Sequence, residues 1–254
     1  MLRILRSWRA GAAPALFAFV CPALLAAGNP SGNDLWVDAL RVADLARILR
    51  LAEDGADVNR RGDQPKTALM VAAKAGDARL VGRLIDAGAD VHATNPNGGT
   101  ALMYAALAGD TVSIDLLLRA RARVDAQARN GWTALMVAAA KNHGPVVRQL
   151  VREGADVNLR DIYGWTPLMR AVFEHQGRSV AELLKIAGID LGAREESGAT
   201  ALHLAAIRGD EDLAAVLLAH GADPDARDAA GRTPRMIASS QGLDELADLL
   251  VGRP

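Results

Sequence analysis

The phrase Thr67-Ala68-Leu69-Met70 decides the fold, because it returns along the chain at an almost constant interval. Related phrases begin at Thr100, Thr133, Thr166, Thr200 and Thr233, with successive offsets of 33, 33, 33, 34 and 33 residues. A pair of small residues follows each threonine, as Ala72-Ala73 follows Thr67. This regular spacing indicates a chain of repeating structural units rather than one large core.

A second phrase keeps the same period and marks the end of a helix in each unit. It reads Gly-Ala-Asp-Val at Gly55, Gly88 and Gly154, and it is altered at Gly188 and Gly221. Apolar residues at helical spacing precede it, as in Leu80, Val81, Leu84 and Ile85. Glycine suits this place because the end of a helix often needs a left-handed residue.

The two phrases together resemble the ankyrin repeat, a 33-residue unit in which a turn or hairpin is followed by two antiparallel helices. The resemblance covers residues 34–254, with a divergent first unit at 34–66. It implies an all-α ankyrin-repeat solenoid of about seven helix-turn-helix repeats with short β-hairpin or turn connections. The repeats are expected to start near residues 34, 67, 100, 133, 166, 200 and 233, and the first and last should cap the stack.

The residues of one unit predict how it is built. Each threonine should cap the first helix by accepting an N–H of its first turn. A turn glycine such as Gly76 should then end that helix in a left-handed conformation, a geometry that Asn142 also tolerates and for which His175 is the exception. Arg121 stands where other units have the second glycine, so this turn should be weaker or differently shaped. A one-residue insertion between Gln176 and Gly188 is the other irregular place.

Composition and charge exclude several classes of protein. The net charge of −1 gives no general basic excess, so neither nucleic acid nor an anionic membrane is expected as the main partner. The one cysteine, Cys21, cannot form an internal disulfide, and no cluster of cysteine and histidine has the spacing of a metal site. We therefore expect no metal and no cofactor.

The N-terminal segment has the order of a secretory signal. Arg3, Arg6 and Arg9 precede an apolar run that ends in the small residues Ala26-Ala27-Gly28. We expect a signal peptide at 1–28 and a short linker at 29–33. The signal should direct export into the periplasm of a bacterium. An uncleaved membrane anchor is the alternative, and lipid attachment at Cys21 is disfavoured because Ala18-Phe19-Val20 precedes it. After cleavage no stable membrane insertion is expected.

The methionines and histidines offer little chemistry. Five methionines occupy the fourth position of the repeat phrase, where the ankyrin family commonly has histidine: Met70, Met103, Met136, Met169 and Met236. We interpret them as core packing, with an oxidant sensor as the alternative. The histidines stand in no metalloprotease, triad or zinc spacing, and no activated nucleophile is recognisable, so the sequence predicts no catalysis.

Aromatic residues give the best signal for a binding face. By the family resemblance they lie on hairpins and inner helices, which form the concave face that ankyrin arrays use for binding. The candidate partner-binding residues are Tyr104, Trp132, Tyr163, Trp165, Arg170 and Phe173, and a basic rim is expected from Lys74, Arg129, Lys141, Arg170 and Arg208. Rigid exposed aromatics make good interface anchors, although tryptophan before the threonine also packs locally in the family.

These observations predict a non-catalytic scaffold, an expected monomer, that binds a partner protein through its concave face. Two alternatives belong to other classes of function. One is a regulatory subunit or inhibitor of an exported enzyme, and the other is the oxidant sensor based on the methionines. The identity of the partner is not encoded in any recognisable motif.

Overall fold

The computed structural model describes residues 32–61 and 63–251, so the expected signal peptide lies outside the described residues. Within these ranges the chain forms fourteen helices and no strand, and an isolated antiparallel bridge joins Thr94 to Thr100. The helices are α2 (Gly32–Val42), α3 (Leu45–Glu53), α4 (Ala68–Ala75), α5 (Ala78–Asp86), α6 (Ala101–Ala108), α7 (Thr111–Arg119), α8 (Ala134–Ala140), α9 (Gly144–Arg152), α10 (Pro167–Phe173), α11 (Gly177–Leu183), α12 (Ala201–Arg208), α13 (Glu211–Ala219), α14 (Pro234–Ser240) and α15 (Asp244–Leu249). The expected all-α repeat architecture is confirmed.

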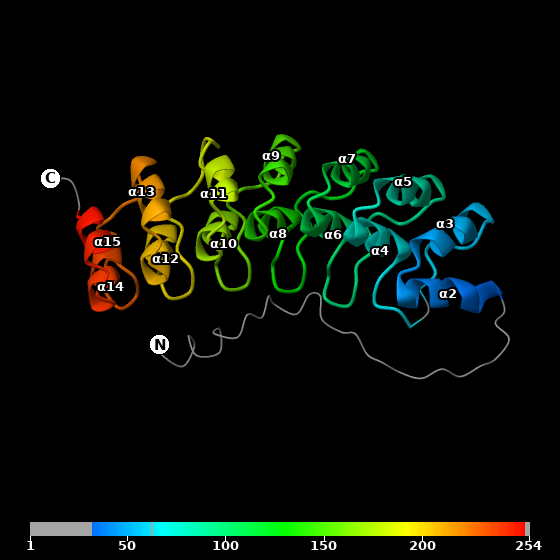
Figure 1. Ribbon diagram of the computed structural model, residues 1–254, viewed down its shortest axis with the longest axis horizontal. Helices are drawn as coiled ribbons and strands as arrows, with labels where there is room; N and C mark the ends of the chain where they lie inside the picture. Colours follow the sequence, from blue (N-terminus) through cyan, green and yellow to red (C-terminus); the bar gives the residue numbers. More distant parts are fainter. Residues whose placement is uncertain (1–31, 62, 252–254) are drawn as a thin grey trace.

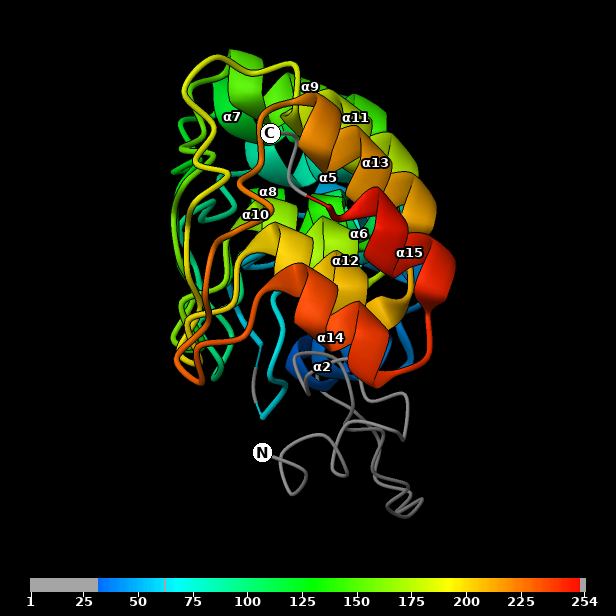
Figure 2. The same cartoon turned by 90° about the vertical axis from the view of Figure 1, so that its left-hand side faces the viewer.

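The helices form seven antiparallel pairs that stack side by side in one curved row (Figure 1). The inner layer consists of α4, α6, α8, α10, α12 and α14. The outer layer consists of the odd-numbered helices α3, α5, α7, α9, α11, α13 and α15. Seen along the row, the loops that enter the inner helices lie together on one side of both layers (Figure 2). Each helix packs mainly against its own partner and the equivalent helices of neighbouring units, as expected for a solenoid.

The threonines cap the inner helices as the sequence predicts. The Oγ1 atoms of Thr67, Thr100, Thr166 and Thr233 accept the backbone N–H of the methionine three residues later at 3.3 Å, and that of Thr133 does so at 3.2 Å. Each contact satisfies one backbone donor that the first helical turn leaves without a partner. The repeated threonine is therefore a local requirement of helix entry.

The turns between helices are left-handed whether or not glycine occupies them. Gly76 ends α4 with φ of 70°, while Asn142 and His175 take φ values of 61° and 56° at equivalent turns. Arg121 has φ of 69° after α7, so the second turn of this unit keeps the family geometry without glycine. Such a conformation costs a residue with a side chain about 1 kcal/mol.

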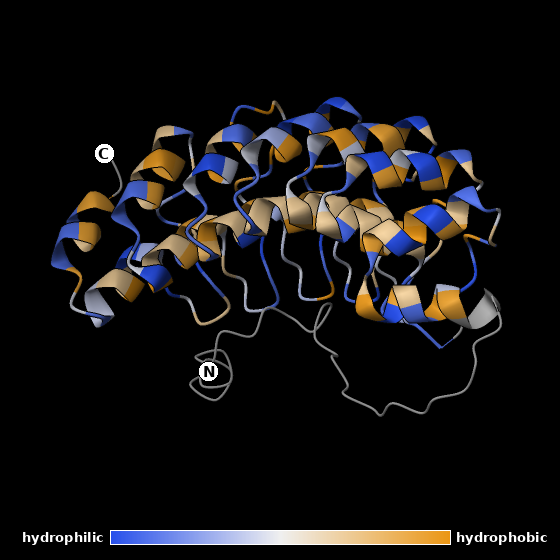
Figure 3. Cartoon of the chain, turned by 45° about the vertical axis from the view of Figure 1, so that its right-hand side comes forward, coloured by the Kyte–Doolittle hydropathy of each residue, from blue (hydrophilic) through white to orange (hydrophobic). Residues whose placement is uncertain are grey.

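The core lies between the two helix layers and is built from small residues. The alanine pairs of the inner helices, including Ala72-Ala73 and Ala138-Ala139, are completely buried. Figure 3 shows the inner helices as a mostly apolar band, whereas the outer helices alternate between hydrophilic and hydrophobic residues. Small side chains let neighbouring inner helices approach closely, and the larger leucines fill the space toward the outer layer.

The first unit closes its end of the stack with Trp36. This side chain is buried, and its Nε1 donates to the carbonyl oxygen of Arg60 at 2.6 Å. At the other irregular place, α11 ends at Leu183 after seven residues, two fewer than α9, and the inserted residue lengthens the turn that follows. Among the described residues no helix is long and apolar enough to cross a membrane.

Backbone hydrogen bonds join the tips of consecutive loops. The N–H groups of Arg129 and Ala229 donate to Asn97 and Ser197 at 2.9 Å, and the same ladder links Ile162 to Asn130 at 3.2 Å. Gly131 allows this approach, because a Cβ there would lie 2.6 Å from the Cα of Asp161 and because its φ is 79°. The loops therefore form one connected surface beside the inner helices.

Candidate protein-binding face

Arg170 lies at the centre of the candidate site, between two tryptophan rings. Its guanidinium carbon is 4.8 Å from the ring centroid of Trp132 and 4.4 Å from that of Trp165. The two tryptophans come from consecutive loops, whereas Arg170 comes from the buried side of α10. We call this arrangement, together with Asp161, the Arg170 clamp. The cation–π contacts of the guanidinium with both tryptophans tie the two loops to one inner helix.

Asp161 completes the clamp from inside the α9–α10 loop. Its Oδ1 accepts the backbone N–H groups of Tyr163 and Trp165 at 2.9 and 3.0 Å. Its Oδ2 accepts Arg170 Nε at 3.1 Å and also forms an ion pair with Arg170 Nη2. The carboxylate is fully buried, so every lone pair that it uses must be satisfied inside the protein. The loop is therefore held by side-chain contacts in addition to its backbone ladder.

The contacts continue from the clamp toward the next unit. The rings of Trp165 and Phe173 meet edge to face at 5.1 Å, and the Arg208 guanidinium carbon lies 5.0 Å from the Phe173 ring centroid. Arg208 Nε donates to His175 Nε2 at 3.0 Å, and His175 Nδ1 lies 2.5 Å from Asp210 Oδ2. Because Nε2 accepts from Arg208, Nδ1 is the ring nitrogen that donates to Asp210.

On the other side of the clamp the contacts are different. Tyr104 is only 1% exposed and its hydroxyl accepts Asn95 Nδ2 at 2.9 Å. Burial raises the pKa of Tyr104, and the hydrogen bond from Asn95 offsets part of that rise. Lys66 Nζ lies 5.5 Å from the centroid of the Tyr104 ring. Burial, followed by the charge of Lys74, lowers the pKa of Lys66.

The exposure of the predicted residues divides them into two groups. Tyr163 is 45% exposed, while Trp165 and Phe173 are half-buried. Trp132 is 8% exposed and Arg170 is 3% exposed, so the expected solvent exposure of Trp132 is wrong and Arg170 does not belong to a solvated basic rim. Both are buried because they stack on each other. The use of these residues for binding stays a prediction.

Sequence reasoning missed Ile162, which is 56% exposed beside Tyr163 at the loop tip. The signal was available, because the equivalent positions in other units hold Pro96, Arg129 and Glu196, none of which is a large apolar residue. An exposed pair of large apolar side chains at a turn is unusual, and here the turn is also held firmly by Asp161. Ile162 and Tyr163, which we call the apolar tip, are both exposed at the end of this loop.

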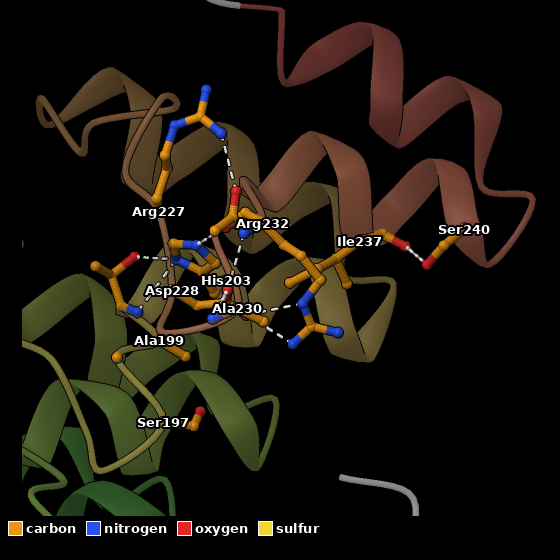
Figure 4. Close-up of polar contacts among 12 residues, drawn as sticks. Ser197, Ala199, His203, Arg227, Asp228, Ala230, Arg232, Ile237 and Ser240 are labelled. Carbon is orange, nitrogen blue, oxygen red and sulfur yellow. Dashed lines mark hydrogen bonds and ion pairs between the residues drawn. The ribbon is translucent and has the colours of Figure 1, made fainter.

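His203 forms a second buried network at the end of the array (Figure 4). Its Nδ1 accepts the backbone N–H of Thr200 at 3.2 Å, so its Nε2 donates to the carbonyl oxygen of Arg232 at 3.0 Å. Burial lowers the pKa of His203, although the Arg232 carbonyl favours the protonated ring. Burial alone would raise the pKa of Asp228, but hydrogen bonds and charge from Arg232 outweigh it and lower that pKa.

The methionines at the equivalent position make no such link through their side chains. Met70, Met103, Met136 and Met169 are buried in the core, and Met236 in the last unit is 50% exposed. Buried thioethers are poorly accessible to oxidants, which disfavours the sensor interpretation for four of the five. Within the described ranges no three His, Cys, Asp or Glu side chains are placed to hold a metal ion.

Comparison with known proteins decides the family. A family model for ankyrin repeats in three copies matches residues 38–128, 111–195 and 174–253, which is most of the chain. The chain belongs to the ankyrin-repeat family. No curated protein matches it.

The ankyrin array also resembles solved structures. The ankyrin-repeat domain of Bcl-3, a member of the IκB protein family, is 28% identical with a TM-score of 0.72; the match covers 89% of this chain and 99% of that one. Because 590 chains match this array at a significant level, likeness of fold alone selects no partner. Ankyrin repeats are generally scaffolds for protein–protein interaction, so the specific chemistry must come from this array's own surface.

Proposed function

We propose that this ankyrin array is a non-catalytic scaffold that binds a partner protein through its loops and inner helices. The observation that carries the proposal is the apolar tip, which projects from a loop fixed by the Arg170 clamp. An anchor that is already ordered loses little conformational entropy on binding, so more of its burial contributes to affinity. Tyrosine is also among the residues most enriched at binding hot spots.

The contacts around the tip support binding rather than catalysis. Asp161, Arg170 and His203 are among the buried polar groups, and each is engaged in contacts that hold the loops. His175 is paired with Asp210 and Arg208 near the surface, with no nucleophile in the pair. These groups are arranged to stabilise loop geometry, which is what a binding scaffold requires.

We also propose that the protein is exported. The support is the order of Arg3, Arg6 and Arg9 before an apolar run with small residues at 26–28. Mass spectrometry of the protein from a periplasmic extract should give a new N-terminus within a few residues of Gly28. Recovery of the full-length chain from the cytoplasm alone would overturn this part of the proposal.

Photo-crosslinking tests the binding function directly. A photoreactive phenylalanine analogue is placed at position 163 in the expressing cell, and in a matched control at position 216 on α13, where Val216 is also exposed. We expect a specific protein adduct from position 163 and none of the same mass from position 216. Equal adducts from both positions, or none from position 163, would contradict binding through the apolar tip.

The affinity of the crosslinked partner then measures the contribution of the tip. The double change Ile162→Ala with Tyr163→Ala should weaken binding by more than about 2 kcal/mol, the hot-spot scale. The free energy of unfolding should change by less than about 1 kcal/mol, because both side chains are exposed. Trp165→Ala is unsuitable for this test, because Trp165 stacks on Arg170 and Phe173 and its loss would disturb the loop.

A further inference from the structure

The inner helices differ from the outer helices in the sign of their charges. The six inner helices from α4 to α14 contain no aspartate or glutamate, although they carry Lys74, Arg170, Arg208 and Arg235. The whole chain has a net charge of −1, so this is a local separation of charge. Charge on one face that is not mirrored by the whole molecule indicates selection of a complementary surface.

Some cations of the outer helices pair with acids of the same layer. Arg83 pairs with Glu53 at 3.1 Å across α5 and α3, and Arg148 lies 3.7 Å from Glu182 across α9 and α11. Arg119 pairs with Asp115 within α7 at 3.1 Å. The outer layer therefore carries acids among its cations, whereas the inner helices from α4 to α14 carry cations alone.

Three exposed cations, Lys74, Lys141 and Arg208, and the half-buried Lys66 lie on the inner face or at its edge. Within the described ranges no carboxylate lies at ion-pair distance from Lys66, Lys74, Lys141 or Arg208, which come from four of the seven units. Lys66 and Lys74 repel each other strongly enough to contribute to the lowered pKa of Lys66. These four cations would therefore be stabilised by an anionic group from another molecule.

Nearby acids do not cancel this charge. Asp77, Asp110 and Asp210 follow the inner helices, but their carboxylates accept backbone N–H groups at the starts of α5, α7 and α13. Such caps place the negative charge against the positive end of a helix. Glu174, next to α10, and Asp63, three residues before Lys66, are exposed acids beside the row.

Half-buried apolar side chains stand between the cations. Leu107, Phe173 and Ile207 occupy equivalent places near the ends of α6, α10 and α12. Phosphate backbones offer nothing to these side chains, whereas a polypeptide can place an apolar residue between two acids. The mixture therefore favours a peptide over a nucleic acid.

We propose that the inner face binds an extended segment of the partner protein that is rich in aspartate and glutamate and carries apolar residues among them. The inference rests on the proposed scaffold function and adds the chemistry of the partner. Helices packed about 10 Å apart place the cations of units two to six along roughly 40 Å. At about 3.3 Å per residue, an extended segment of roughly twelve residues spans that distance.

Selection of peptides tests this chemistry. A displayed library of random twelve-residue peptides is selected on the purified protein, and the winners are sequenced. We expect aspartate and glutamate to be enriched at least twofold over the unselected library. The selected peptides could instead lack acidic enrichment and still bind the variant Ile162→Ala with Tyr163→Ala more weakly than wild type. That result would overturn the acidic inference and leave the scaffold function standing.

Matched charge variants locate the bound peptide. Lys74→Gln with Lys141→Gln removes two exposed cations from the inner face, and Arg79→Gln with Arg152→Gln removes two exposed cations from α5 and α9. A selected acidic peptide should bind the first variant at least tenfold more weakly and the second within twofold of wild type at the same salt concentration. Equal weakening in both variants would overturn the assignment to the inner face.

A final arm separates peptide from nucleic acid. A twelve-nucleotide single-stranded DNA is compared with the selected peptide in the same fluorescence assay. Tighter binding of the DNA would overturn the proposal in favour of a nucleic-acid partner. Failure to select any peptide would count against both the acidic inference and the scaffold function.

Discussion

Two neighbouring loops of the array, at residues 120–133 and 153–166, have the same backbone plan and very different reinforcement. In the second loop Asp161 accepts two backbone N–H groups and pairs with Arg170, which stacks between two tryptophans. The first loop has Ala128 in the place of Asp161. It relies instead on Gln127, whose Nε2 donates to the carbonyls of Gly131 and Arg160 at 3.0 and 3.1 Å.

The connection to the following unit also differs between the two loops. Asn158 Nδ2 donates to the Gly188 carbonyl at 2.9 Å, while its Oδ1 accepts the Asp190 N–H at 2.9 Å. Asp125 stands at the equivalent position in the first loop. Its carboxylate accepts the Asp156 N–H at 3.1 Å but, unlike the Asn158 amide, has no N–H to donate. Burial raises the pKa of Asp125; the Asp156 N–H lowers it and the Asp156 charge raises it further.

This comparison indicates that a position of the repeat tolerates substitution only where a neighbouring side chain replaces the missing contact. The second loop presents the apolar tip and gains a clamp that no other unit has in the described ranges. The first loop carries Arg121 in a left-handed turn and Asp125 without donor capacity, so its junction is the weaker one.

The largest effect is expected from Arg170→Met, which keeps a long apolar stem but leaves the Asp161 carboxylate buried without its cation. We expect a loss of about 3–5 kcal/mol in the free energy of unfolding, the scale for breaking a buried ion pair. The control Arg129→Met removes an exposed arginine from the first loop and should change that free energy by less than about 0.5 kcal/mol. Urea denaturation measures both, and similar losses would show that the clamp contributes little.

His203→Met gives a reference outside both loops, because it installs the methionine found in other units. Removing the ring leaves the Thr200 N–H and the Arg232 carbonyl short of partners, at a cost of about 1–3 kcal/mol near neutral pH. The lowered pKa of His203 means that the unfolded chain binds the proton more readily. The contribution of His203 to the free energy of unfolding is therefore fully present above pH 6.5, the ordinary pKa of histidine. This contribution is lost as the pH falls below that value.

This pH dependence is measured by urea denaturation of wild type and His203→Met between pH 7.5 and 5. The advantage of the wild type should shrink as the pH falls. A constant difference across the range would mean that His203 does not titrate at a lower pH in the folded state than in the unfolded chain.

Asp125→Asn should restore the missing donor and remove the repulsion from Asp156. We expect a gain of about 1 kcal/mol at pH 7. Because folding raises the pKa of Asp125 above 3.8, the gain should diminish as pH falls through this region and the native carboxyl takes up a proton. The reciprocal change Asn158→Asp should transfer the defect to the second loop, and a stabilising effect there would contradict the explanation.

The smallest effect is expected at the left-handed turn. Arg121→Gly should stabilise the protein by up to about 1 kcal/mol, because Arg121 has φ of 69°. Gly154→Arg should destabilise it by a similar amount, since Gly154 has φ of 87° with no atom within 4 Å of an added Cβ. Denaturation curves that move in the same direction for both changes would exclude backbone strain as the cause.

Much of the fold follows from the sequence because each unit repeats a local signal. Threonine at the helix start and a left-handed residue at the turn fix the helix bounds without long-range information. The Arg170 clamp cannot be predicted from such local signals. Arg170 belongs to one helix and its tryptophans to two loops, so only the stacking of units brings the guanidinium and the two rings together. For the same reason the burial of Trp132 and Arg170 does not follow from the sequence, whereas the comparison of equivalent positions could have singled out Ile162.

Amide hydrogen exchange tests most directly the central claim that Arg170 fixes the loop bearing the apolar tip. The Tyr163 and Trp165 amides donate to Asp161, and they should exchange more slowly than the Trp132 amide, which donates to Asn130 at 3.2 Å. In Arg170→Met the protection of Tyr163 and Trp165 should fall at least tenfold more than that of Leu204 in α12. Protection of Tyr163 and Trp165 that is unchanged, or that falls only in proportion to Leu204, would contradict the claim.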